Sequence, residues 1–205
     1  FPGKGHTNPM KQPEYQDRLT MVPIDSWKNP QENLAQHFEG ADAVISCLGH
    51  RQPGWKNRQL IKRGLIATDG NRQVIAAMKE AKDCSKRAVV ISSVGIKEDY
   101  PSMEFHFAGK IMDLFFKTNT KKAFKDLTEM EEAYHASDLD YLFVRPVGIG
   151  EEVVPENKWW LQQEKGKDAL GMNMAKLDVA RFMVKEALNP TMTRRGVVIG
   201  SKPPK

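Results

Sequence analysis

The chain contains little cysteine and no long hydrophobic run, and each absence excludes a class of protein. Its 205 residues include only two cysteines, Cys47 and Cys84. So few cysteines argue against a disulfide framework, and we expect buried or half-buried free thiols in a reducing compartment. No run of about 18 apolar residues is present, which predicts no membrane span. With no signal peptide visible, the sequence indicates a cytoplasmic protein, or one of an organellar matrix or stroma if an N-terminal targeting segment was removed.

A concentrated positive charge is also missing. The net charge is +5, and the lysines and arginines are dispersed, with only short clusters such as Lys121-Lys122 and Arg194-Arg195. A dispersed excess of this size is typical of a solvated surface, so the sequence predicts no nucleic-acid partner and favours an anionic small ligand. The length fits a single domain over residues 1–205, and the 40% hydrophobic content is ordinary for a globular protein.

Strand-like and helix-like segments alternate along the chain. We expect strands over 19–24, 43–48, 87–92, 141–144 and 197–199, helices over 30–40, 58–82, 103–117, 124–137 and 176–188, and an irregular segment over 153–171. The run over 43–48 is nearly all apolar, which is typical of a strand buried on both faces. This order predicts an α/β fold with a doubly wound parallel sheet and helices on both of its faces.

The most informative stretch is a helix that leads into a buried strand ending on two hydroxyls. The helix includes residues 69–78, the strand follows over 87–92, and Ser92 and Ser93 stand at its end. A doubly wound sheet presents its functional groups at the carboxyl edge of its strands. The two serines are therefore candidates for a ligand site.

Five motifs in order resemble the atypical short-chain dehydrogenase/reductases, in particular the NmrA-like and flavin reductase-like NAD(P)-binding group. The motifs are Asp42 to Gly49, Asp69 to Ala77, Val89 to Ser93, Ser137 to Pro146, and Leu177 to Ala180. The resemblance covers about Arg18 to Ser201. It implies a Rossmann-like NAD(P)-binding domain, NADP or NAD as cofactor, and reduction of a small flat or carbonyl-containing acceptor of the flavin, quinone or bilin type.

The resemblance implies eight cofactor-binding positions that lie at strand ends or in the loops after them. They are Asp25, Leu48, Gly49, Ser92, Pro146, Val147, Gly148 and Ile149. Asp25 would lie near the adenine, and Leu48 and Gly49 under the ribose and phosphate. Ser92 would stand beside the nicotinamide, with residues 146–149 wrapping it from the far side. For Gly49 and Gly148, simple turn geometry is the alternative explanation.

Three residues are candidates for catalysis. Ser93 would orient the substrate by a hydrogen bond, with a strand-end cap as the alternative. In better-known dehydrogenases a Tyr-x-x-x-Lys pair follows this serine, and here His106 and Lys110 stand at a similar distance. They are i and i+4 on one helical face, and a histidine can donate a proton near neutral pH. The alternative is that His106 is a surface residue.

Two departures from the family pattern leave a second function open. His106 replaces the tyrosine, and Gly148 stands where flavin reductase-like relatives carry a histidine. A protein with these changes could be a catalytically inactive member of the fold that acts as a redox sensor, regulator or scaffold subunit. The first hypothesis requires a small-molecule substrate, and the second requires a protein partner.

The glycine-rich phosphate loop of such a fold is missing. Gly3 and Gly5 are not preceded by an apolar strand, so they cannot form the dinucleotide fingerprint. We expect the family's first strand and glycine-rich turn to precede Phe1. Lys4, His6 and Lys11 are weak candidates for holding a 2′-phosphate, and surface positions are the alternative.

Some residues have more than one reading that the sequence leaves open. Arg145 could contact a phosphate or cap its strand, but a structural ion pair is the simpler interpretation. Trp159 and Trp160 could stack on a flat acceptor, although anchoring of a long loop is the ordinary role for such residues.

No metal site is predicted. Glu129, Glu131 and Glu132 cluster in the helix expected over 124–137, but no histidine or aspartate pattern supports them as ligands. We expect these three glutamates on a solvated helix face.

Overall fold

Most strands of the protein belong to one largely parallel sheet. The computed structural model describes residues 17–30, 32–49, 66–94, 96, 121–151, 153, 155, 159–162 and 174–201. The main sheet has the order β1 (Val44–Ser46), β2 (Arg87–Ile91), β3 (Asp140–Pro146), β7 (Arg195–Ser201) and β5 (Trp159–Gln162). The first four strands run parallel, and β5 is antiparallel to β7. A second, two-stranded parallel pair joins β4 (Ile149–Gly150) to β6 (Met174–Ala175).

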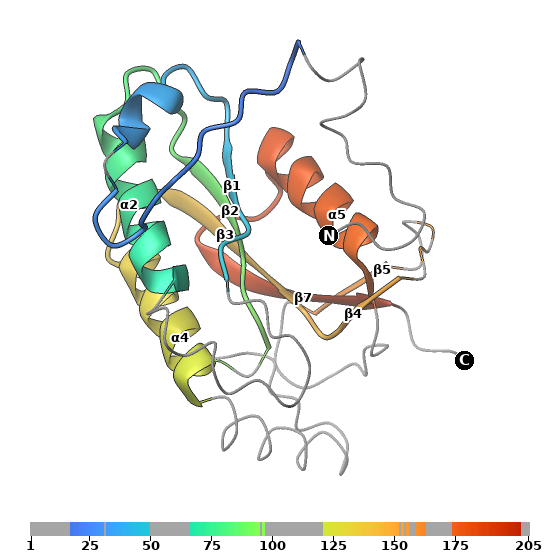
Figure 1. Cartoon of the computed structure of the whole chain (residues 1–205). Helices are drawn as coiled ribbons and strands as arrows, with labels where there is room; N and C mark the ends of the chain where they lie inside the picture. Colours follow the sequence, from blue (N-terminus) through green and yellow to red (C-terminus); the bar gives the residue numbers. More distant parts are fainter. Residues whose placement is uncertain are drawn as a thin grey trace.

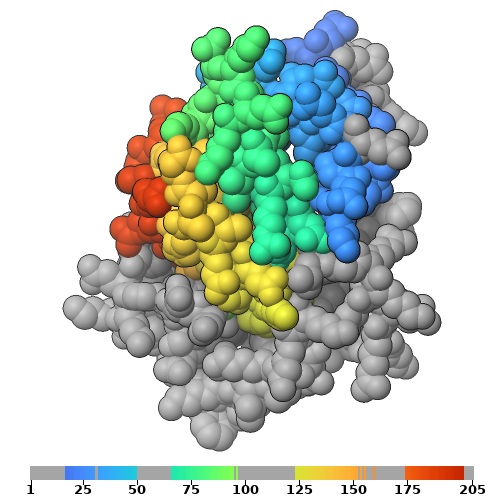
Figure 2. Space-filling model, turned by 90° about the vertical axis from the view of Figure 1, so that its left-hand side faces the viewer, coloured from blue at the N-terminus to red at the C-terminus, as the bar shows by residue number. Residues whose placement is uncertain are grey.

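Helices cover both faces of the main sheet. Helices α2 (Ile66–Glu80) and α4 (Lys121–His135) lie on one face, and α5 (Lys176–Leu188) lies on the other (Figure 1). Figure 2 looks onto the first of these faces and shows α2 and α4 side by side, with the segment that includes the short 3-10 helix η2 (Leu34–His37) flanking α2. The predicted α/β fold with a doubly wound parallel sheet is thereby confirmed.

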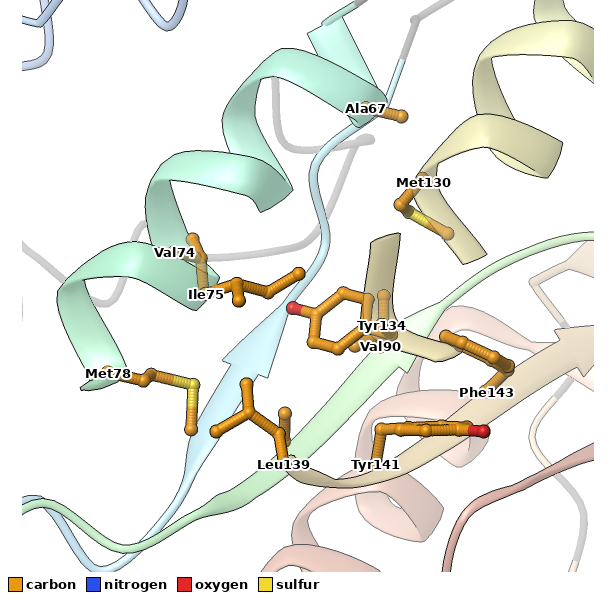
Figure 3. Close-up of a cluster of buried hydrophobic side chains, with 11 residues drawn as sticks. Ala67, Val74, Ile75, Met78, Val90, Met130, Tyr134, Leu139, Tyr141 and Phe143 are labelled. Carbon is orange, nitrogen blue, oxygen red and sulfur yellow. The ribbon is translucent and has the colours of Figure 1, made fainter. Parts of the chain in front are cut away.

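The alternation of side chains along β3 separates two apolar cores. Tyr141 and Phe143 belong to the core beneath α2 and α4, whereas Leu142 and Val144 belong to the core beneath α5. Figure 3 shows the first core, in which Tyr134 of α4 lies between α2 and β3. The Tyr134 and Phe143 rings meet edge to face, with their centroids 5.8 Å apart. Each fully buried side chain of this size contributes about 1.5–3 kcal/mol through removal from water.

Polar contacts join α2 to α4 across the same core. The buried carboxylate of Asp126 accepts hydrogen bonds from the backbone N–H groups of Ala67 (3.0 Å) and Thr68 (2.7 Å) in the first turn of α2. The first N–H groups of a helix lack partners within the helix, so this carboxylate caps α2 from another helix. The Tyr134 hydroxyl also donates to Asn71 Oδ1 (2.9 Å), and burial raises the pKa of Tyr134.

The prediction of a strand over 19–24 is wrong. The structure gives this segment no regular secondary structure, and Leu19 and Met21 are exposed. Pro23 lacks a backbone N–H, so it cannot complete a ladder of hydrogen bonds. Ile24 instead packs with Leu34 and neighbouring residues against α2.

The elements on either side of Gly40 are shorter or less buried than predicted. The helix expected over 30–40 is the single 3-10 turn η2, capped by the Asn33 side chain. Gly40 does end this region, with a φ of 67° that favours glycine. The strand expected over 43–48 is β1, and Ile45 in it is 40% exposed, so β1 is not buried on both faces.

Both cysteines are free thiols, as the sequence predicts, but Cys47 is exposed rather than buried. Cys84 is partly buried. Desolvation by surrounding protein atoms raises the pKa of each thiol above its ordinary value. Both thiols therefore stay protonated at neutral pH.

The segment after β4 is more regular than predicted. Residues 159–162 form β5, although the whole of 153–171 was expected to be irregular. Trp159 packs in the core beneath α5, and its ring meets Phe182 edge to face with the centroids 6.4 Å apart. This position favours the anchoring role of Trp159 over stacking on a ligand.

Asp138 makes two surface contacts, which predict a small dependence of the protein's stability on pH. Hydrogen bonds from Lys86 and Lys79 hold the pKa of Asp138 at about 2, below its ordinary value of 3.8. The resulting stability is present above pH 3.8 and is lost as the pH falls towards 2. Because Asp138 is exposed, the effect is small.

We therefore expect Asp138→Asn to lower the thermal midpoint slightly at neutral pH and to make no difference near pH 2. Thermal unfolding of both proteins across this range measures the effect. A difference between them that stays constant with pH would contradict the assignment.

Candidate functional site

Of the predicted site residues that the structure describes, all except Asp25 lie at the carboxyl edge of the parallel sheet. Because β1, β2 and β3 run parallel in neighbouring positions, the residues that follow them lie along the same edge. Leu48 and Gly49 follow β1, Ser92 and Ser93 follow β2, and residues 146–149 include the end of β3 and the start of β4. This edge is the place where doubly wound folds bind ligands.

Ser92 is engaged within the protein. Its side chain is buried, and its hydroxyl donates a 2.5 Å hydrogen bond to Glu131 Oε1. Its backbone N–H donates to the carbonyl oxygen of Val144 at 2.8 Å. The Ser92 hydroxyl is therefore committed to α4.

Ser93 is the more accessible of the two serines. It is half-buried, and its hydroxyl lies 3.4 Å from the carbonyl oxygen of Val94, which is long for a hydrogen bond of this type. Among the described residues, the Ser93 hydroxyl is therefore held less firmly than that of Ser92. Both readings of Ser93, substrate contact and strand-end cap, stay predictions.

Glu131 and Arg145 form a buried ion pair next to Ser92. The two residues are 4% and 5% exposed. Arg145 Nε donates to Glu131 Oε1 at 3.2 Å, and Arg145 Nη2 donates to Glu131 Oε2. The Arg145 guanidinium fills the space beside Gly196, where a larger residue would collide with it. Arg145 thus has the structural role that was its simplest interpretation.

The expectation that Glu131 lies on a solvated helix face is wrong, and the sequence held a signal for its burial. Leu127, Met130 and Tyr134 form a stripe at helical spacing that packs in the core. Glu131 falls inside that stripe, four residues after Leu127 and three before Tyr134. An acid at such a position indicates a buried carboxylate with a partner.

Leu48 and Gly49 differ in what they offer a ligand. The side chain of Leu48 is turned towards α2, where its Cδ1 would lie 2.6 Å from a Cβ added at Gly70. Gly49 is exposed and has no left-handed φ, and no atom of the described residues lies within 4 Å of the place where a Cβ would stand. Turn geometry therefore does not require glycine here, and its backbone is open to close approach by a ligand.

The segment over 146–149 is held by backbone hydrogen bonds. The Val147 N–H donates to Ile199 O at 3.2 Å, and the Met174 N–H donates to Gly148 O at 2.9 Å. Pro146 is buried at the end of β3, whereas the Ile149 side chain is 51% exposed. The segment therefore has a fixed backbone and presents one apolar side chain.

The structure does not place Asp25 at a strand end. Asp25 is exposed in an irregular segment, and its neighbours Ile24 and Trp27 pack towards η2 and α2. The reason is the missing strand over 19–24. His106 and Lys110 lie outside the described residues, as do Lys4, His6 and Lys11.

The resemblance assigns Gly49 to the ribose and phosphate of a dinucleotide and residues 146–149 to its nicotinamide, and both assignments stay predictions. Among the described residues, the space beside Gly49 is open at the end of β1, and Ser93 follows β2, the strand that pairs with β3. Within the described part of the chain, no three histidine, cysteine or acidic residues are grouped so that they could hold a metal ion. No helix among the described residues is long and apolar enough to cross a membrane.

Several solved structures share the fold of this chain. ChuY, an anaerobillin reductase from Escherichia coli O157:H7, is 19% identical with a TM-score of 0.55, over 80% of this chain and 67% of that chain. A short-chain dehydrogenase/reductase from Veillonella parvula in complex with NADP is 14% identical with a TM-score of 0.57, over 83% and 68%. A chuY structure from E. coli CFT073 is 19% identical with a TM-score of 0.52, over 68% of this chain and 64% of that chain. The present chain thus spans about two thirds of the length of these proteins.

No curated protein matches this chain. A family model described as NAD(P)H-binding matches residues 6–190, which is most of the sequence. This match agrees with the Rossmann-like sheet and with the motifs of the atypical short-chain dehydrogenase/reductases. The chain belongs to this NAD(P)H-binding family.

Proposed function

We propose that the protein is an NAD(P)H-dependent oxidoreductase that reduces a small flat or carbonyl-containing acceptor of the flavin, quinone or bilin type. The observation that carries the proposal is the accessible Ser93 hydroxyl at the carboxyl edge of the sheet, in a chain whose family binds NAD(P)H. The reductase activity in the name of the structural neighbour ChuY supports the same class of reaction.

In the proposed reaction the bound cofactor supplies the hydride. Ser93 donates a hydrogen bond to the oxygen or nitrogen of the acceptor on which negative charge develops. The open backbone at Gly49 allows close approach of the cofactor, and Ile149 provides an apolar contact on the other side. The protein's contribution is therefore orientation and charge stabilisation.

Binding and turnover test the proposal separately. Titration calorimetry with NADPH and NADH measures binding, and loss of absorbance at 340 nm with FMN or menadione measures oxidation of the cofactor. Binding with turnover supports the reductase. Binding without turnover of either acceptor favours the alternative, a non-catalytic sensor, regulator or scaffold of the same fold. Absence of binding at millimolar cofactor contradicts the reductase and leaves a scaffold of the same fold.

We expect Ser93→Ala to lower kcat for NADPH oxidation roughly a hundredfold, because the acceptor loses its hydrogen-bond donor in the transition state. The Kd for NADPH should change little. Ser137→Ala is the matched control, since the Ser137 hydroxyl donates to Tyr134 O at the opposite edge of the sheet. This control should keep its kcat. Equal values of kcat for Ser93→Ala and the unmodified protein would show that Ser93 has no role in the reaction.

A further inference from the structure

Three side chains from three elements meet just below the candidate site. Ser92 comes from the end of β2, Glu131 from α4, and Arg145 from β3. Glu131 Oε1 accepts from both the Ser92 hydroxyl and Arg145 Nε, and Oε2 accepts from Arg145 Nη2. We call these three residues the Glu131 cluster. All three are buried, so these hydrogen bonds replace those that water would make.

The stability of the fold does not by itself explain such a cluster. Burying an ion pair costs desolvation energy that the attraction between the charges often only offsets, and apolar residues of similar volume can serve as well. A satisfied buried network does restrict the positions of the segments that it joins. The segments that Glu131 joins to α4 are the end of β2 and β3, so their positions are the ones that it restricts.

The residues next to the Glu131 cluster are those of the candidate site. Ser92 directly precedes Ser93, and Arg145 directly precedes Pro146. Successive side chains of an extended strand point to opposite faces. Because Glu131 holds the Ser92 side chain towards α4, continuation of this alternation beyond Ile91 predicts that the Ser93 side chain is turned to the other side.

We propose that Glu131 is a positioning residue for the candidate site. By holding Ser92 and Arg145, it determines that Ser93 presents its hydroxyl to the acceptor, and it fixes the segment over 146–149 relative to Ser93. This inference rests on the proposed function for its catalytic consequence. The positional part stands on the geometry alone and can be measured without cofactor.

A second buried carboxylate–arginine pair provides a matched control. Glu186, which is also buried, accepts from Thr191 Oγ1 at 2.6 Å and from Arg87 Nη2 at 3.5 Å. Arg87 begins β2, so this pair lies at the amino edge of the sheet, far along the strand from Ser92. Glu131→Gln and Glu186→Gln therefore remove the same charge from similar surroundings at opposite edges.

The first measurement reports the position of residue 93 directly. In a Cys47→Ser/Cys84→Ser background, the thiol introduced by Ser93→Cys is alkylated with iodoacetamide and the rate is followed by mass spectrometry. We expect Glu131→Gln to raise the rate about tenfold, because the end of β2 loses hydrogen bonds to a charged group. Glu186→Gln should leave the rate unchanged. Equal rates in the two glutamine variants would overturn the proposal.

The second measurement separates positioning from general destabilisation. At a temperature chosen below the measured thermal midpoints of both variants, we expect Glu131→Gln to lower kcat for NADPH oxidation about tenfold with little change in KM for NADPH. Glu186→Gln should retain both constants. If Glu131→Gln does not fold, Ser92→Ala replaces it, because it removes one hydrogen bond and leaves the ion pair in place. Ser92→Ala should then accelerate alkylation at position 93, and an unchanged rate would overturn the proposal.

The results distinguish failure of the proposed function from failure of the positioning role. If the unmodified protein binds no NADPH, the proposed function is contradicted, but a tenfold alkylation difference between the glutamine variants still supports the positioning role. If NADPH is oxidised and the two variants are indistinguishable in both assays, the proposed function stands and the positioning role is overturned.

Discussion

Replacement of Phe143 by alanine is expected to lower the free energy of unfolding by about 3–5 kcal/mol. The Phe143 side chain is fully buried in the middle of β3, against Tyr134 of α4 and Tyr141 of the same strand. Its removal loses the transfer energy of the ring and leaves a cavity between the sheet and α4 that the rigid strand cannot close. Chemical denaturation monitored by circular dichroism gives the change in free energy.

Two further variants check the cause of this loss. Phe143→Leu fills most of the cavity and should cost clearly less than the alanine variant. Leu188→Ala removes a side chain that is 63% exposed at the end of α5, and should change stability by less than about 0.5 kcal/mol. A cost for Phe143→Ala as small as that of Leu188→Ala would show that β3 is not the central element of this core.

The second large effect is expected at Arg87, where alanine should cost about 3–5 kcal/mol. The guanidinium is buried and donates to Glu186 O (2.9 Å) and Met192 O (2.9 Å), and it also pairs with the Glu186 carboxylate. Its removal leaves the buried charge of Glu186 without its countercharge. The loss should appear in the unfolding free energy and leave the Kd for NADPH unchanged, because Arg87 lies at the opposite edge from the candidate site.

Lys86 provides the comparison for Arg87. It is the preceding residue, it is exposed, and it pairs with Asp138 at 2.6 Å on the surface. Exposed pairs contribute about 0–1 kcal/mol, so Lys86→Ala should have a correspondingly small effect. If Arg87→Ala and Lys86→Ala lose the same free energy of unfolding, burial does not increase the contribution of the Arg87–Glu186 pair to stability.

The central strands could be predicted because burial on both faces leaves a clear trace in the sequence. A strand was expected over 87–92, and β2 spans Arg87–Ile91. The apolar run over 141–144 is the middle of β3, which extends to Asp140–Pro146. Parallel strands covered by helices on both sides need apolar residues at consecutive positions, which local sequence shows directly.

Elements at the periphery were less predictable because their state depends on distant partners. The segment over 19–24 has a strand-like composition, yet the structure shows no strand there. Pro23 has no backbone N–H, so the segment lacks one of the hydrogen-bond donors that a strand needs. Residues 159–162 form β5 by pairing antiparallel with β7, about forty residues later in the chain. Nothing within the tetrapeptide itself specifies that pairing.

The candidate site was predictable in its location but not in its internal contacts. The strand-end pattern identified Ser92 and Ser93 equally. The difference between them comes from Glu131, which is 39 residues away in the chain. Only a tertiary contact could engage the Ser92 hydroxyl and not that of Ser93.

The capping of α2 by Asp126 has a consequence for how the protein opens. The N–H groups of Ala67 and Thr68 depend on a side chain of α4, so neither helix can separate without exposing a buried carboxylate and orphaned donors. Helices α2 and α4 therefore form one cooperative unit. The slowest-exchanging backbone amides of α2 and α4 should therefore report the same free energy of opening in hydrogen–deuterium exchange. We expect this agreement although 40 residues of chain separate Glu80 from Lys121.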